Sequence, residues 1–222
     1  MDKMIIFSFT GEGTQLNRKL TQFCKKNEIL VESYSVERYA ENELLPLPQK
    51  RQEFIRENWG KSGFIFIGAA GIAVRWIAPF VKDKFTDSPV LVMDEKGKYV
   101  IPILSGHIGG AVELAEQIGM WIEAEVVHTT ATDVQQKFAV DVFARKYHLL
   151  FKDRKKAKEI SAAVLEGKKI ACLIEDQDII IEGKIPKELI ICRSRKDWEL
   201  YPYKVKLESF REKRAEKAEE PG

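Results

Sequence analysis

The chain has 222 residues, enough for one large domain or two small ones, and 45% of them are hydrophobic and 32% charged. Basic and acidic residues nearly balance, 36 against 34, which argues against a dedicated nucleic-acid-binding protein. The apolar run near the N-terminus is too short for a membrane span or a signal peptide. Three cysteines without a CxxC pair and three histidines without zinc-ligand spacing predict a cytoplasmic protein that owns no metal site.

The first third of the chain alternates between strand and helix patterns. In chain order we expect a strand, a helix, a strand, a loop and a helix, at residues 4–9, 10–24, 29–36, 41–48 and 49–59. The turn before the first helix, Gly11-Glu12-Gly13, resembles part of a dinucleotide-binding fingerprint, but Leu16 stands where the third glycine would be. A tight strand-to-helix turn is therefore the favoured interpretation, and nucleotide binding is the alternative.

A continuous apolar run, Phe64–Ile67, is typical of a central parallel strand that is covered on both faces. The small residues Gly68–Gly71 follow it, and a helix is expected over 72–78. Gly68 and Gly71 would let the backbone approach a ligand, or let helix and sheet pack closely. Arg75 is either a solvated arginine or a fork for a carboxylate, because it follows this glycine-rich loop closely.

A second strand end carries the densest group of polar and small residues. Strands are predicted at 90–93 and 99–104, with a turn at 94–97 that indicates a hairpin. Ser105-Gly106-His107-Ile108-Gly109-Gly110 follows, and a helix is expected over 109–120. The loop offers a hydroxyl, an imidazole and backbone N–H groups at a helix start, where an anion or a developing oxyanion is favoured.

The third such junction is His128–Asp133, after a short strand at 126–127 and before an expected helix over 134–147 that Asp133 could cap. Because each of the three clusters follows an apolar run and precedes a helical pattern, we expect Gly68, Ser105–Gly110 and Thr129–Asp133 to meet at one edge of the sheet.

Beyond residue 150 the pattern predicts a smaller α/β unit and no glycine-rich or histidine-bearing cluster. Its elements are a helix at 153–165 and strands at 170–174, 179–181 and 189–192. The expected fold is α/β, with three layers, a mainly parallel sheet and helices on both faces, followed by this second unit. The expected divisions are an N-terminal domain with the active site, the smaller unit and a charged tail, at residues 1–140, 141–203 and 204–222.

The central stretch resembles the CbiG family of cobalamin biosynthesis proteins, the cobalt-precorrin-5A hydrolases. The similar segments are GIAVRWIAP, KFTDSPVLVMDEKG, VIPILSGHIGGAVELA, and TTATD followed by FAVDVFA. They occur in the family's order and cover about residues 60–145. The resemblance implies a further C-terminal domain that this sequence does not contain. That domain could be a separate partner protein, or it could be dispensable.

The resemblance also implies a reaction: opening of the δ-lactone of cobalt-precorrin-5A and release of acetaldehyde, giving cobalt-precorrin-5B. The implied partner is a small-molecule cobalt corrinoid, and the implied cofactor is none, because the cobalt arrives inside the substrate. His107 is the expected proton-transfer group, and an axial ligand to the substrate's cobalt is its alternative role. Ser105 is a weaker catalytic candidate, since no nucleophile elbow surrounds it. The expected substrate-binding residues are Gly68, Gly71, Arg75, Lys84, Asp87, Gly106, Gly109, Gly110, Thr129, Thr130 and Asp133.

Two other interpretations stay open from the sequence. One is a non-catalytic corrinoid-binding subunit that needs a partner domain. The other is a phosphate- or nucleotide-binding α/β protein that uses Gly68–Gly71 and Ser105–Gly110, although no Walker motif supports it.

Overall fold

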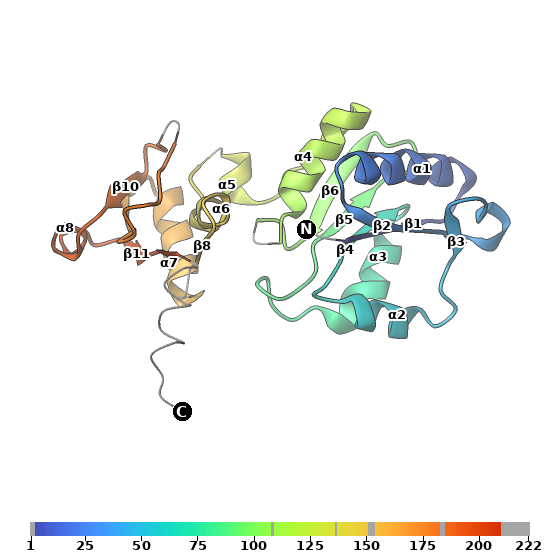
Figure 1. Cartoon of the computed structure of the whole chain (residues 1–222), viewed down its shortest axis with the longest axis horizontal. Helices are drawn as coiled ribbons and strands as arrows, with labels where there is room; N and C mark the ends of the chain where they lie inside the picture. Colours follow the sequence, from blue (N-terminus) through green and yellow to red (C-terminus); the bar gives the residue numbers. More distant parts are fainter. Residues whose placement is uncertain (1–2, 108, 136, 151–153, 183–184, 210–222) are drawn as a thin grey trace. The chain divides into compact units, whose positions relative to one another are not determined.

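The computed structural model describes residues 3–107, 109–135, 137–150, 154–182 and 185–209 (Figure 1). The chain forms two compact units, Met1–His128 and Thr129–Gly222. The sequence pattern put the division after residue 140, whereas the contacts group the chain from Thr129 onward with the second unit.

Unit 1 is built on a seven-stranded sheet of order β3-β2-β1-β4-β5-β6-β7. Its strands are β1 (Lys3–Ser8), β2 (Leu30–Ser35), β3 (Leu44–Pro46), β4 (Gly63–Ile67), β5 (Val90–Met93), β6 (Tyr99–Leu104) and β7 (Glu125–Val126). Its helices are α1 (Gly11–Lys26), η1 (Glu37–Tyr39), α2 (Arg51–Asn58), α3 (Ala70–Ile77), η2 (Ala78–Phe80) and α4 (Ala111–Ile122).

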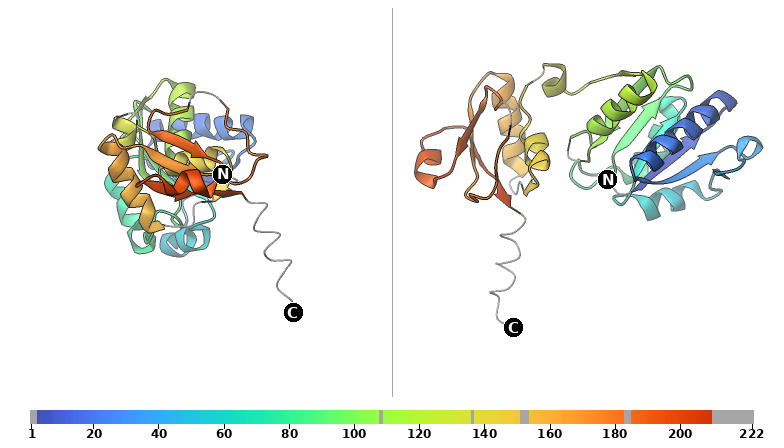
Figure 2. Two further views of the ribbon diagram at one scale, coloured as in Figure 1. Left: turned by 90° about the vertical axis from the view of Figure 1, so that its left-hand side faces the viewer. Right: turned by 45° about the horizontal axis from the view of Figure 1, so that its top comes forward.

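Helices cover both faces of this sheet, α1 and α4 on one side and α2 and α3 on the other (Figures 1 and 2). Under α1 and α4 the buried core includes Leu20, Ile65 and Ile118. Under α2 and α3 it includes Phe7 and Trp76, whose ring centroids lie 5.1 Å apart. Successive apolar side chains of the central strands point to opposite faces of the sheet, so both faces are buried. The expected three-layer α/β architecture is confirmed.

The direction of the strands changes once along the sheet. Strands β1 to β5 are mutually parallel, β6 is antiparallel to β5, and β7 is parallel to β6. The predicted hairpin turn is present, with the Gly97 N–H donating to the Asp94 carbonyl at 3.0 Å. As a result, β6 ends at the edge where β4 and β5 begin, because Leu104 pairs with Val90.

Unit 2 contains a three-stranded parallel sheet of order β10-β9-β11 and a small antiparallel pair, β8 with β12. Its elements are α5 (Ala131–Val134), α6 (Val140–Lys146), β8 (Leu149–Leu150), α7 (Arg154–Leu165), β9 (Ile170–Leu173), β10 (Leu189–Cys192), α8 (Arg195–Glu199), β11 (Lys204–Lys206) and β12 (Glu208–Ser209). In the described part of the chain no helix is long and apolar enough to cross a membrane.

Three local predictions in unit 2 were wrong. The helix expected over 134–147 is divided into α5 and α6, because Phe138 between them is buried in the core, and packing overrides helical periodicity. The run 179–181 is not assigned as a strand. The expected tail begins with two strands, since Val205 and Leu207 are each only 1% exposed and belong to the same core.

Candidate functional site

Three loops meet at the edge of unit 1 where β6 ends and β5 begins. The Ser105 hydroxyl donates a hydrogen bond to the Asp87 carbonyl oxygen at 2.8 Å. The Trp59 indole N–H donates to Asp87 Oδ1 at 3.3 Å, and the Gly60 N–H donates to Ser88 Oγ at 2.8 Å. The loops after α2, before β5 and after β6 are thereby tied into one surface.

The Asp87 carboxylate has a structural role at this edge. It is 7% exposed and accepts the backbone N–H groups of Lys82, at 2.9 Å, and Asp83, at 2.9 Å, besides the Trp59 indole. A buried carboxylate with these donors is stabilised in place and holds the 82–87 loop closed. Lys84 lies on the same loop, exposed, with its ammonium 5.0 Å from the centre of the Phe85 ring.

The backbone of the 105–110 loop turns tightly into α4. Ser105 has a φ of 51° and Gly110 a φ of 86°, both in the left-handed region. The Gly110 N–H donates to the His107 carbonyl at 3.2 Å, and the Val112 N–H to the Gly106 carbonyl at 3.0 Å. The Gly110 and Val112 N–H groups are therefore used within the turn itself. The glycines of this loop have a packing role, beside the predicted role of binding an oxyanion.

Gly109 is required by its neighbours. A Cβ atom at this position would lie 2.6 Å from the Ser105 Cβ and 2.7 Å from the Ser105 carbonyl oxygen. At Gly106 the nearest atom would be a Val112 methyl at 3.1 Å, the end of a side chain rather than backbone. The half-buried His107 lies between these two glycines and is the side chain of the loop able to exchange a proton near neutral pH.

The expected convergence of Gly68 with this loop was wrong. Gly68 follows β4, and its N–H donates to the Met93 carbonyl at 2.8 Å, at the far end of β5. Because Met93 pairs with Val100, at the start of β6, and Val90 with Leu104, Gly68 and Ser105 lie at opposite edges of the sheet. Gly71 and Arg75 belong to α3, which starts at the Gly68 edge, and the Arg75 guanidinium donates to the Gly71 carbonyl at 3.1 Å.

The opposite edge is the place where strand connections diverge, between β1 and β4, and such points often bind ligands. Here the Phe9 ring covers Gly68, since a Cβ on that glycine would come within 3.0 Å of it. Leu16, at the position of the missing third glycine, is buried in the core at 6% exposure. Gly11 and Gly13 lie in the first turn of α1, and the Thr10 side chain caps this helix by accepting the Gly13 N–H at 3.1 Å, which fits a tight strand-to-helix junction. Gly68–Gly71 and Ser105–Gly110 do not form one phosphate site.

Comparisons with known proteins indicate the family of the chain. Residues 53–133 match the family description "Cobalamin synthesis G N-terminal", and residues 138–189 match "Cobalamin biosynthesis central region", together more than half of the chain. The chain belongs to the CbiG family.

This CbiG chain is similar to the cobalt-precorrin-5A hydrolase of Priestia megaterium, 42% identical over 113 residues, covering 51% of this chain and 30% of the relative. It is also similar to the enzyme of that name from Salmonella typhimurium, 34% identical over 157 residues, covering 70% of this chain and 43% of the relative. The chain thus spans less than half of each relative.

A crystal structure of a cobalamin biosynthesis protein G homolog from Sulfolobus solfataricus has a similar fold. The TM-score is 0.57 at 20% identity, over 93% of this chain and 60% of the homolog. This likeness concerns the fold.

The last cluster of predicted residues begins the second unit of the CbiG chain. Thr129 and Thr130 are exposed, and the Thr130 carbonyl accepts the N–H of Val134 in the short helix α5. Asp133 lies within α5 rather than before it, and its side chain is outside the described part. Strand β7 runs parallel to β6 and pairs with its first residues, Glu125 with Tyr99 and Val126 with Val100.

The sequence did not single out Trp59 or Ser88, although both fix the candidate site. Their only signal is position: each lies in a loop that enters a central strand, β4 or β5. Among the described residues, no group of three or more His, Cys, Asp or Glu side chains could hold a metal ion.

Proposed function

We propose that this chain contributes to cobalt-precorrin-5A hydrolysis, opening the δ-lactone and releasing acetaldehyde. The observation that carries the proposal is the match of residues 53–133 to the CbiG N-terminal family description. These residues include all three loops of the candidate site. The names of the relatives at 42% and 34% identity support the same activity.

The chemistry requires proton transfers in two steps. Water adds to the lactone carbonyl carbon and loses a proton, the ring C–O bond breaks, and the departing oxygen takes up a proton. That hydroxyl then loses its proton as the neighbouring carbon–carbon bond breaks, and the electron pair stays with the macrocycle while acetaldehyde leaves. His107 is the group we assign to these transfers, because imidazole exchanges protons near neutral pH.

Ser105 is better suited to holding the site than to attacking the substrate. Its hydroxyl proton is donated to the Asp87 carbonyl, a group that cannot accept the proton as a base would. Asp87 is equally committed to the 82–87 loop. Lys84, exposed on that loop, supplies a positive charge at the same edge for a substrate carboxylate.

The test is an assay of the chain alone on cobalt-precorrin-5A, with acetaldehyde trapped and the corrinoid followed by absorbance. Acetaldehyde release at a rate that depends on this chain supports the hydrolase. Binding without release, with activity restored by a separate C-terminal CbiG domain, would instead show a corrinoid-binding subunit. Absence of any corrinoid binding would contradict both.

A further inference from the structure

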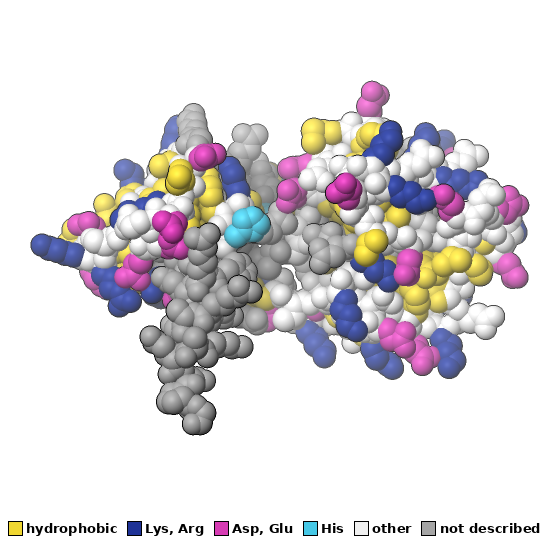
Figure 3. All heavy atoms as spheres, viewed as in Figure 1, with side chains coloured by type: hydrophobic (Ala, Val, Ile, Leu, Met, Phe, Trp, Pro, Cys, Tyr) yellow, Lys and Arg dark blue, Asp and Glu magenta, His cyan; other side chains and the backbone are white. Residues whose placement is uncertain are grey.

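An open groove on the surface of unit 1 is lined by residues of helices α2 and α3 and of the segment just before α2. Its volume is about 780 Å³, and its basic residues are Lys50, Arg51, Arg56 and Arg75. The groove residues include a single carboxylate, Glu53. Figure 3 shows Lys and Arg side chains over these two helices.

The positive charge of this groove is largely uncompensated within the described part of the chain. Glu53 pairs with Lys50 at 3.2 Å, across an exposed i,i+3 step of the helix. For Arg51, Arg56 and Arg75, the ion pairs among described residues include no carboxylate partner. A concave surface of one sign raises the local concentration of oppositely charged ligands.

Two of the three guanidinium groups are positioned by neutral partners. Arg51 lies over the Trp76 ring, 5.4 Å from its centre, and Arg75 donates to the Gly71 carbonyl at 3.1 Å. Trp76 itself is 7% exposed and packs at 5.1 Å and 5.7 Å against the Phe7 and Phe9 rings. Arg51 and Arg75 are therefore held near a rigid core with donors remaining for a ligand, and each guanidinium can fork onto a carboxylate.

We propose that this groove is a docking site for the peripheral carboxylates of a cobalt corrinoid, and this inference rests on the proposed function. Four cations spread over two helices match a ligand with several spaced carboxylates better than one compact anion. The groove is distinct from the loops of Ser105 and His107, because none of its lining residues belongs to those loops. It assigns substrate recognition to Lys50, Arg51 and Arg56 in addition to Arg75.

The experiment measures binding of two probes to the full chain by absorbance titration. Cobyrinic acid presents free carboxylates on its rim, and its methyl ester presents the same ring without the charges. The wild-type chain should bind the acid at least about tenfold more tightly than the ester. Added sodium chloride should lower the affinity for the acid and leave the affinity for the ester unchanged.

The double variant Arg56→Gln with Arg75→Gln should weaken binding of the acid at least about tenfold and leave the ester unchanged. The control, Lys19→Gln with Lys168→Gln, removes two exposed charges elsewhere and should leave both affinities unchanged. Equal losses in the two variants, or no loss in the arginine variant, would overturn the proposal. So would displacement of the acid by inorganic phosphate at an ionic strength where chloride leaves it bound, because the groove would then be a phosphate site.

Failure of the groove and failure of the proposed function give different results. Arginine-independent binding together with acetaldehyde release from cobalt-precorrin-5A would remove the groove and keep the hydrolase. Arginine-dependent binding without acetaldehyde release, even with a C-terminal CbiG domain added, would keep the groove and remove the hydrolase.

Discussion

At the scale of single residues, the polar groups of the candidate site differ in burial and in acid–base chemistry. Ser105 and Asp87 are both 7% exposed, and each is committed to joining loops. His107 is half-buried in the loop that joins Ser105 to α4, and its imidazole is suited to moving protons. This difference predicts opposite outcomes for substitutions only two residues apart.

His107→Ala should lower acetaldehyde release by ~100-fold or more, the usual scale for losing a positioned acid–base group. Thermal stability should change by no more than about 1 kcal/mol, because a half-buried loop side chain has few core contacts to lose. His107→Gln, which can hydrogen-bond but not carry a proton, should be nearly as inactive. Trapped acetaldehyde and the unfolding midpoint are the two measurements. Loss of the folded state in both variants would make His107 a structural residue.

Ser105→Ala is the matched comparison. It removes one buried hydrogen bond, so the free energy of unfolding should fall by about 1 kcal/mol. Turnover under conditions where the variant is folded should stay close to that of the wild-type chain. A loss of activity as deep as that of His107→Ala would return Ser105 to the nucleophile role.

At the scale of elements, the sequence identified the strand-to-helix junctions but not the edges on which they lie. Three apolar runs ending in small and polar residues were recognised correctly as strands β4, β6 and β7. A common edge follows only if the strands run the same way. The hairpin turn at 94–97 reverses the chain between β5 and β6, so it already required that Gly68 and Ser105 separate. The sequence therefore contains the signal that separates Gly68 from Ser105, because strand carboxyl ends lie together only where the strands are parallel.

The glycines of the 105–110 loop allow a test of packing against chemistry. Gly109→Ala should destabilise unit 1 by about 1–3 kcal/mol, because its Cβ would overlap Ser105 backbone and side-chain atoms at 2.7 Å and 2.6 Å. Gly106→Ala should cost clearly less, since the Val112 methyl at 3.1 Å can move. Urea unfolding of the two variants measures the difference. Equal costs would mean that the turn is looser than its contacts indicate.

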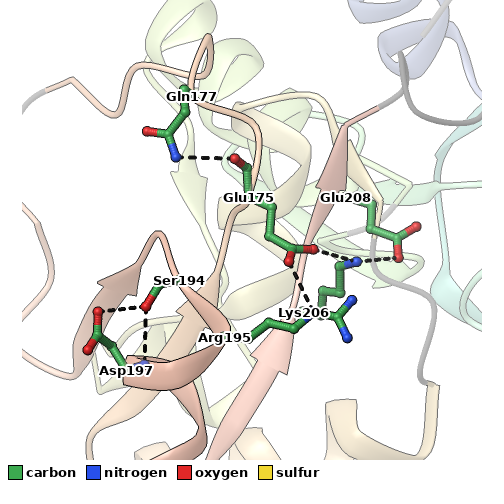
Figure 4. Close-up of polar contacts among 7 residues, drawn as sticks. All are labelled: Glu175, Gln177, Ser194, Arg195, Asp197, Lys206 and Glu208. Atoms are coloured by element: carbon green, nitrogen blue, oxygen red, sulfur yellow. Dashed lines mark hydrogen bonds and ion pairs between the residues drawn. The ribbon is translucent and has the colours of Figure 1, made fainter.

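In unit 2 the carboxyl ends of β9 and β11 carry a charged cluster (Figure 4). Glu175 contacts Lys206 at 2.8 Å and Arg195 at 3.1 Å, and Lys206 also reaches Glu208 at 3.4 Å. Hydrogen bonds from Lys206 and then Arg195 hold the pKa of Glu175 below its usual value. The ionised carboxylate therefore stabilises the folded state.

The sign of the pH dependence follows from that lowered pKa. Stability from Glu175 is present above the pKa of the carboxyl in the unfolded chain and is lost as the pH falls through its folded-state pKa. Glu175→Gln should therefore unfold at lower urea than wild type at pH 7, and the gap should close as the pH falls below about 4. The effect should be small because these side chains are partly exposed. A gap that widens toward low pH would contradict the assignment.

At the scale of the whole molecule, each unit has cores of its own. The clusters in unit 1 contain residues up to Val126, and those in unit 2 contain residues from Phe138 to Leu207. Apolar periodicity was enough to predict both units, since it reports burial within each. It did not give the break between α5 and α6 or the strands after residue 203, because those depend on partners distant in the chain, such as β8 for β12.

Separate cores predict that residues 1–128 fold without the rest of the chain. All of the strands that complete the seven-stranded sheet, and both helical layers, lie within this fragment. Its thermal midpoint should lie within about 5 °C of the matching transition in the full chain, a shift on the scale of about 1 kcal/mol. A shorter fragment, 1–104, is the control: it lacks α4, whose Leu114, Ala115 and Ile118 are buried in the core, and it should not show a cooperative transition. Near-ultraviolet circular dichroism and a melting curve distinguish the two fragments. If 1–128 has no cooperative transition, unit 1 requires contacts with the second half of the chain, and the two units would fold as one cooperative body.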